Sequence, residues 1–312
     1  MFSRIPFRTI AIITAASIAS IRLRAEDPPE KPKRPDIYDK QADGDQQIAA
    51  ALPAAKRENK RVLLQFGANW CGWCHKLHAL FHDDKDIDRE LRYEYEVVLI
   101  DVDKTDGAKH NAKIDERYGN PTQHGLPALV VLDADGQQLT TQDTGELEEG
   151  DHHNPEKVLA FLKKWQAEPV AADEVLSGAL SRAKTEHKLV FVYFSAPWCG
   201  WCKKLDAYLH RDQIARIFET AYVPVKIDED RMTGGKALEA KFRREDDKGI
   251  PFFVVLDATG KKLADSNGPK GNIGFPAEPD EIEHFKRVVR QTAPALNSQQ
   301  VEILEQGLKP GQ

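Results

Sequence analysis

An internal duplication constrains the fold of this chain more than any other feature of its sequence. Shifting the sequence by 128 residues places residues 62–77 on residues 190–205, with ten of sixteen positions identical. A second block, residues 125–139, matches residues 249–263 at nine of fifteen positions with an offset of 124, so the second copy is four residues shorter between the blocks. A chain of 312 residues has room for two such domains, each with its own core. We therefore expect two copies of one domain.

Each copy repeats one order of helix and strand patterns. The expected elements of the first and second copy are an amphipathic helix (46–58, 173–185), a strand (62–66, 190–194), a cysteine loop leading into a helix, a second strand (96–101, 223–228), a charged helix (109–117, 236–243), a proline-led apolar strand, a tight turn, a short strand and a final helix (155–166, 280–290). Helices between strands imply parallel pairing, whereas the turns at Gly136 and Gly260 imply an antiparallel hairpin. The pattern indicates an α/β fold, with a central mixed sheet flanked by helices in each copy.

All four cysteines of the chain fall in two pairs spaced by two residues, Cys71 with Cys74 and Cys199 with Cys202. A bridge within either pair closes only a short loop and constrains the unfolded chain little, so a redox role explains the pairs better than structural stapling. Two alternatives remain, a four-thiolate zinc site and copper capture by one pair. Structural zinc knuckles bring their pairs from short turns, whereas these pairs lie 128 residues apart in separate copies.

The cysteines fall where a strand ends and a helix begins. The first cysteine of each pair, Cys71 or Cys199, is then at the helix N-terminus, where free backbone N–H groups and the helix dipole stabilise a thiolate. These two residues are the predicted nucleophiles. Cys74 and Cys202 lie one turn further along the helix, placed to attack a mixed disulfide, and are the predicted resolving cysteines.

The motif around each pair resembles the thioredoxin superfamily over residues 45–166 and 172–293. The shared features are the apolar strand, the Trp before the first cysteine, the Cys-Gly-Xaa-Cys centre with a basic residue soon after, and a downstream Gly-Leu-Pro127 or Gly-Ile-Pro251. The resemblance implies thiol-disulfide exchange without a bound cofactor or metal. It also implies cis peptide bonds before Pro127 and Pro251, with the backbone of Leu126 or Ile250 pairing with an extended substrate segment.

Two departures from the thioredoxin pattern concern the chemistry. Thioredoxins have a buried Asp six residues before the nucleophile, which helps to move the proton of the resolving cysteine, whereas this chain has Gln65 and Tyr193 there. The residue before the second cysteine, which tunes the redox potential in this superfamily, is Trp73 or Trp201. The direction of exchange therefore does not follow from the motif. An exported branch of the superfamily with Trp-Cys-Gly-Trp-Cys-Lys centres is the nearest resemblance.

Residues beside the centres have both structural and functional interpretations. Four tryptophans flank the cysteines, and their amphipathic rings suit the rim of a peptide-binding surface better than a core; they are Trp70, Trp73, Trp198 and Trp201. His75, beside Cys74, is a candidate charge that favours the thiolate, and His78 with His82 is either a metal pair or a solvated helix face. Asp101 and Asp228 are interpreted as strand-end capping residues. Lys76 and Lys204 are interpreted as surface residues that raise the local positive potential.

The termini and connections complete the predicted organisation. Arg4 and Arg8 precede an uncharged stretch of 13 residues, which is short of the roughly 20 residues that span a bilayer, so cleavage after Ala25 is favoured over an uncleaved anchor. The predicted parts are a signal peptide at 1–25, a flexible linker at 26–44, thioredoxin-like domains at 45–168 and 169–293, and a C-terminal tail at 294–312 containing one candidate helix at 301–305. The short connection at 167–172 predicts restricted motion between the domains.

The sequence thus predicts an exported thiol-disulfide oxidoreductase, periplasmic or extracellular, that exchanges disulfides with protein substrates or a redox partner. The charges are mixed along the chain, with a formal net charge of −6 and no basic run, which excludes a nucleic-acid-binding class. No stable membrane insertion is expected after removal of the signal. The alternative is a non-catalytic tandem binding module whose cysteines remain inert disulfides.

Overall fold

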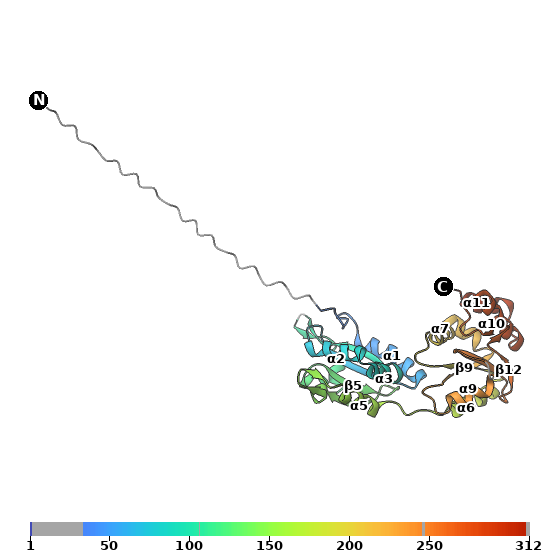
Figure 1. Ribbon diagram of the computed structural model, residues 1–312, viewed down its shortest axis with the longest axis horizontal. Coiled ribbons are helices and arrows are strands. Elements are labelled where there is room, and N and C mark those ends of the chain that lie inside the picture. The colour runs from blue at the N-terminus through green and yellow to red at the C-terminus, as the bar shows by residue number, and fades with distance from the viewer. Residues whose placement is uncertain (2–33, 106, 245–246, 310–312) are drawn as a thin grey trace. The chain divides into compact units, whose positions relative to one another are not determined.

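The computed structural model describes residue 1 and residues 34–105, 107–244 and 247–309 (Figure 1). The predicted signal peptide lies outside this part of the chain apart from Met1. None of the helices in the described ranges is both long and apolar enough to cross a bilayer.

The first domain follows the expected order of elements. In chain order these are α1 (Gly44–Glu58), β1 (Arg61–Gly67), α2 (Gly72–Asp83), α3 (Lys85–Glu94), β2 (Tyr95–Asp101), β3 (Lys104–Thr105), β4 (Ala108–Lys109), α4 (Ala112–Arg117), the 3-10 turn η1 (Pro121–His124), β5 (Ala128–Leu132), β6 (Gln138–Asp143), the 3-10 turn η2 (Thr144–Leu147), β7 (Glu148–Glu149), β8 (His152–His153) and α5 (Pro155–Trp165). Four strands form one sheet in the order β2-β1-β5-β6. β1 pairs with β2 in parallel and with β5 in antiparallel orientation, so the mixed sheet is confirmed.

The second domain repeats this architecture. Its elements are α6 (Ala172–Glu186), β9 (Leu189–Ser195), α7 (Gly200–Leu209), α8 (Asp212–Phe218), β10 (Tyr222–Asp228), α9 (Gly235–Phe242), β11 (Phe252–Leu256), β12 (Lys262–Asp265), β13 (Asn267–Gly268), β14 (Gly271–Asn272), α10 (Pro279–Thr292) and α11 (Ser298–Gln306). The sheet order is β10-β9-β11-β12, which corresponds strand for strand to the first sheet. The duplication read from the sequence is therefore a duplication of the fold.

Alternating side chains of the central strand face two separate cores. In β1, Val62, Leu64 and Phe66 pack with α1 and α4, while Leu63 faces α2, α3 and α5. The same alternation in β9 sends one set toward α6 and α9 and the other toward α7, α8, α10 and α11. Each sheet is consequently covered on both faces, and the cysteine helix packs on the face that also receives Gln65 or Tyr193 of the central strand.

Several local features differ from the sequence-based expectations. The helix expected at 109–117 begins at Ala112, because Lys109 pairs with Lys104 in the β3–β4 hairpin. Helix α3 was not anticipated; the Asp84 side chain begins it by accepting the N–H groups of Asp86 and Ile87.

The segments placed outside the two domains also contribute packed residues. Tyr38, within the expected linker, is 2% exposed. In the expected tail, Val301, Leu304 and Leu308 are buried in the core shared by α7, α8 and α10. Apolar residues at helical spacing in α11 account for this packing. The second domain therefore includes residues up to at least Leu308.

Candidate functional site

The first cysteine pair lies at the junction of β1 and α2. Cys71 has an extended backbone conformation and is the N-cap of α2, and its Sγ accepts the backbone N–H of Cys74 at 3.0 Å. Cys71 and Cys74 form a disulfide with Cα atoms 5.3 Å apart. In the reduced state, the same N–H and the free amides of the helix terminus would face a Cys71 thiolate and lower its pKa.

The second pair repeats this geometry at the junction of β9 and α7. Cys199 is the N-cap, its Sγ accepts the N–H of Cys202 at 3.1 Å, and the two residues form a disulfide with Cα atoms 5.2 Å apart. In each pair the second cysteine is the more buried, with Cys74 and Cys202 fully buried and Cys71 and Cys199 each 4% exposed. The first cysteine of each pair is therefore the more accessible residue.

The two proline loops lie beside the cysteines. The Leu126-Pro127 and Ile250-Pro251 peptide bonds are both cis, as the resemblance implied. The carbonyl oxygen of Leu126 is 3.6 Å from Cys71 Sγ, and that of Ile250 is 3.5 Å from Cys199 Sγ. Each loop leads directly into the strand that pairs with the central strand, so the sheet fixes the loop against the sulfur atoms.

Three of the four tryptophans beside the cysteines are exposed. Trp70 is 65% exposed, Trp198 is 55% and Trp201 is 51%, while Trp73 is half-buried. The indole N–H of Trp70 donates to Asp103, and that of Trp198 donates to Asp230, both at 2.8 Å. These hydrogen bonds hold exposed aromatic rings in place next to Cys71 and Cys199.

The remaining tryptophans have different neighbours in the two domains. The Trp73 ring packs edge-on against His153 with centroids 5.2 Å apart, whereas Trp201 stacks on Phe275 at 6.2 Å. The ammonium group of Lys76 lies 4.3 Å from the Trp73 ring centroid, and that of Lys204 lies 3.9 Å from the Trp201 centroid. The two lysines therefore place positive charge beside the centres.

The position occupied by a buried Asp in thioredoxins holds a neutral network in the first domain. Gln65 is fully buried in β1, and its Nε2 donates to the Tyr38 hydroxyl at 2.7 Å. Burial raises the pKa of Tyr38, and the charge of Asp101 acts in the same direction, so the phenol stays protonated. Tyr38 packs with Cys71 and Cys74 in one buried cluster.

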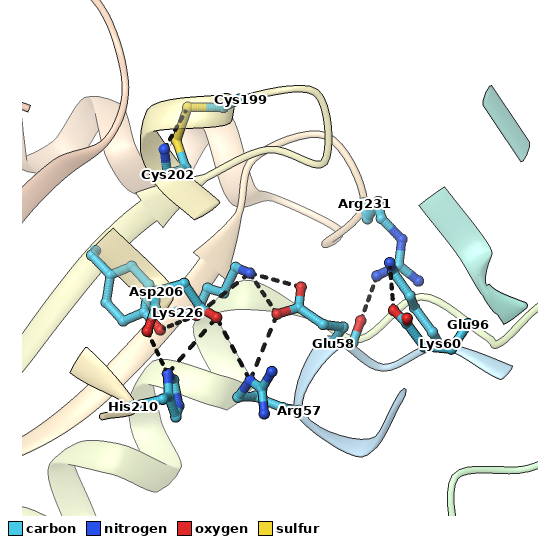
Figure 2. Close-up of polar contacts among 11 residues, drawn as sticks. Arg57, Glu58, Lys60, Glu96, Cys199, Cys202, Asp206, His210, Lys226 and Arg231 are labelled. Carbon is cyan, nitrogen blue, oxygen red and sulfur yellow. Dashed lines mark hydrogen bonds and ion pairs between the residues drawn. A yellow bond between two sulfur atoms is a disulfide. The ribbon is translucent and has the colours of Figure 1, made fainter. Parts of the chain in front are cut away.

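In the second domain a charged network occupies the corresponding place. The buried Tyr193 hydroxyl donates to Asp206 Oδ1 at 2.8 Å. Lys226 Nζ lies 3.7 Å from the same oxygen (Figure 2). Lys226, which is opposite Tyr193 in the β9–β10 register, also donates to both carboxylate oxygens of Glu58 at 2.6 and 2.7 Å. A carboxylate from α1 of the first domain thus completes a polar cluster in the second.

Arg231 provides a further set of polar contacts between the two domains. It forms two hydrogen bonds with the Glu94 carboxylate at 2.7 and 3.0 Å and donates to the backbone oxygen of Asn59 at 2.8 Å. Its side chain is only 8% exposed. Together with the Glu58–Lys226 pair, these contacts join the two domains.

The histidines and strand-end acids have local partners. His75 Nε2 lies 2.8 Å from the Asn69 carbonyl oxygen. His78 and His82 pack edge-on with ring centroids 4.6 Å apart, and burial lowers the pKa of His78. Asp228 caps a turn by accepting the N–H groups of Asp230 and Arg231. No group of three or more metal-ligating side chains occurs within the described residues.

Sequence reasoning missed the polar networks around Gln65 and Tyr193. Tyr38, Asp206 and Lys226 belong to segments interpreted only as a linker, a helix face and a strand. The repeat itself contained one sign that the two centres have different surroundings. Gly67 of the first copy aligns with Ser195 of the second, directly before each cysteine loop.

Comparisons with known proteins place these centres in a family. The sequence model of a family described as thioredoxin-like matches residues 43–134 and 171–258, which together are more than half of the chain. The chain is 25% identical over 182 residues to protein disulfide-isomerase erp38 of Neurospora crassa, covering 58% of this chain and 47% of that protein. It is 29% identical over 214 residues to protein disulfide-isomerase 1 of Dictyostelium discoideum, covering 66% of this chain and 53% of that protein.

The chain thus spans about half the length of these curated relatives. A solved structure described as a disulphide isomerase from Xylella fastidiosa Temecula1 is 36% identical, covers 41% of this chain and 95% of that one, and has a TM-score of 0.37. The family match falls once on each half of the duplication and includes both cysteine pairs. The chain therefore belongs to the thioredoxin-like family.

Proposed function

We propose that this protein is a thiol-disulfide oxidoreductase that exchanges disulfides with protein substrates through its two Cys-Gly-Trp-Cys centres. The observation that carries the proposal is the geometry of each pair, in which a helix N-terminus, a neighbouring N–H group and a proline loop converge on the first sulfur. The curated relatives named as protein disulfide-isomerases support the same chemistry.

The proposed reduction of a substrate uses both cysteines of a centre. The Cys71 thiolate attacks one sulfur of the substrate disulfide, that S–S bond breaks, and the other substrate sulfur leaves as a thiolate. The Cys74 thiolate then attacks Cys71 Sγ, which releases the second substrate thiol and forms the Cys71–Cys74 disulfide. Two electrons pass to the substrate, whose thiolates take up protons from solvent. Oxidation of a dithiol is the reverse sequence, and Cys199 with Cys202 does the same in the second domain.

The surface around the sulfurs fits an extended peptide. Trp70 and Trp198 present aromatic rings beside the nucleophiles, and the backbone of Leu126 or Ile250 offers hydrogen-bonding groups next to the sulfur. A peptide that pairs with this backbone would place its disulfide over Cys71 or Cys199. We also propose that the protein is exported through residues 1–25, which an N-terminal mass of the mature protein beginning after Ala25 would support.

Insulin reduction in the presence of a dithiol tests the activity. We expect the Cys71→Ser and Cys199→Ser variants each to retain the activity of the other centre, and the double variant to fall to the uncatalysed rate. Cys74→Ala and Cys202→Ala variants should accumulate mixed disulfides with substrate proteins. A wild-type protein that neither accelerates insulin reduction nor forms mixed disulfides would support the binding-module alternative instead.

A further inference from the structure

Ile37 and Tyr38 lie against the first redox centre. Asn69, two residues before Cys71, holds them with three hydrogen bonds: its Oδ1 accepts the N–H groups of Ile37 and Tyr38 at 2.8 and 2.9 Å, and its Nδ2 donates to the Tyr38 carbonyl oxygen at 2.9 Å. The side chain of Tyr38 points into the protein and is 2% exposed. This segment is therefore an integral part of the first domain.

The phenol of Tyr38 lies close to the resolving cysteine because residue 67 is glycine. A Cβ atom at Gly67 would lie 2.2 Å from the Tyr38 hydroxyl oxygen and 2.8 Å from Cys74 Sγ, and both distances are too short for a real side chain. Both distances start from the same Cβ position. The Tyr38 hydroxyl oxygen and Cys74 Sγ are therefore separated by at most the sum of the two distances, about 5 Å. The absent side chain leaves room for this approach.

The hydroxyl has a proton to donate. Its oxygen accepts a hydrogen bond from Gln65 Nε2, and the Oε1 of the same amide has no partner. Among the described residues no hydrogen bond uses the phenolic hydrogen. Burial keeps the phenol protonated by raising its pKa. A buried donor with no protein acceptor costs free energy, and an anionic sulfur close by would satisfy it.

The second centre lacks this arrangement. Ser195 takes the place of Gly67, and the buried cluster around Cys199 and Cys202 contains Ala196 and Ile250 but no tyrosine among the described residues. The hydroxyl of Tyr193 is already committed to Asp206. The two centres therefore have different surroundings at their resolving cysteines, although their motifs are identical.

We propose that Tyr38 is a further catalytic residue of the first redox centre, whose hydroxyl donates a hydrogen bond to Cys74 Sγ once the disulfide opens. The hydrogen bond favours the Cys74 thiolate, which attacks Cys71 Sγ in the mixed disulfide; the bond from Cys71 to the substrate breaks and the Cys71–Cys74 bond forms. Tyr38 keeps its own proton throughout. The proton given up by Cys74 passes through solvent to the departing substrate thiolate.

The test measures the ionisation of Cys74 directly, by the ultraviolet absorbance of the thiolate as a function of pH. In a chain carrying Cys71→Ser, Cys199→Ser and Cys202→Ser, Cys74 is the only cysteine. We expect Tyr38→Phe, which keeps the aromatic ring, to raise the pKa of Cys74 by about one unit. This is a roughly tenfold loss of thiolate, the size expected for one hydrogen bond to a charged group.

Matched variants separate this effect from a general disturbance. Tyr38→Phe should leave the pKa of Cys202 unchanged in a chain that retains only that cysteine. Gly67→Ser, which gives the first domain the residue of the second, should displace the hydroxyl and raise the pKa of Cys74 as Tyr38→Phe does. An unchanged Cys74 pKa in folded Tyr38→Phe protein would overturn the proposal. The catalytic role of Tyr38 rests on the proposed exchange reaction, but the titration of Cys74 needs no substrate. A failure of the Tyr38 proposal can therefore be distinguished from a failure of the proposed exchange activity.

Discussion

His153 makes the stability of the first domain depend on pH. It lies in β8 with only 2% of its surface exposed, packs against Trp73, and neither ring nitrogen has a hydrogen-bond partner. Burial is the main reason that its pKa is lowered from 6.5 to about 4, and the nearby positive charges of Lys76 and His152 act in the same direction. The folded domain therefore holds this imidazole in its neutral form.

The magnitude follows from the gap between the folded and unfolded pKa values. Above pH 6.5 both states are neutral and the group costs nothing. As the pH falls below 6.5, the unfolded chain binds a proton that the folded domain does not, so stability is lost at about 1.4 kcal/mol per pH unit until the folded pKa is reached. At pH 5 the expected loss from His153 is about 2 kcal/mol relative to pH 8.

The assay compares His153→Leu with wild-type protein at pH 8 and pH 5. Hydrogen exchange of the amides in β1 and β5 reports the opening free energy of the first domain separately from the second. We expect His153→Leu to lose about 2 kcal/mol less than wild type between these pH values. His124→Gln, a change at an exposed histidine of the first domain, is the matched control and should behave as wild type. Equal losses in His153→Leu and wild-type protein would refute the reasoning.

Two further predictions concern the second domain. Lys226→Met should destabilise it by about 2 kcal/mol in denaturant unfolding, because the part-buried Glu58 carboxylate loses its partner. Adding Glu58→Gln should restore part of that loss, and an additive double variant would contradict the pairing. Tyr208→Phe removes a buried hydroxyl that donates to the Leu304 carbonyl oxygen at 2.8 Å. We expect about 1 kcal/mol of destabilisation and faster hydrogen exchange in α11. Unchanged exchange in α11 would show that this hydrogen bond does not anchor the helix.

The elements that the sequence predicted well are those whose pattern is local and repeated. Strands β1 and β9 are β-branched and aromatic, the cysteines mark the start of a helix, and Gly136 and Gly260 mark turns. Each of these signals occurs twice at matching positions, which separates it from chance. The cis bonds before Pro127 and Pro251 came from the family resemblance rather than from any local pattern.

The features that the sequence did not reveal depend on distant partners. Tyr38 lies in a stretch rich in proline and charge, and its contacts with Asn69, Gln65 and the cysteines of the first centre order it. Asp206 resembles any polar residue on a helix until Tyr193 and Lys226 meet it in the folded domain. Side-chain networks of this kind follow from tertiary packing, so periodicity and spacing carry no signal for them.

The central claim is that both centres exchange electrons reversibly, and redox titration tests it most directly. The protein would be equilibrated in glutathione buffers of graded ratio, quenched with acid, alkylated and analysed by peptide mass, which reports each cysteine pair separately. We predict that Cys71–Cys74 and Cys199–Cys202 each pass between disulfide and dithiol in one two-electron step within the range of the buffer. Pairs that remain disulfides at every ratio would contradict the claim and identify the bridges as inert.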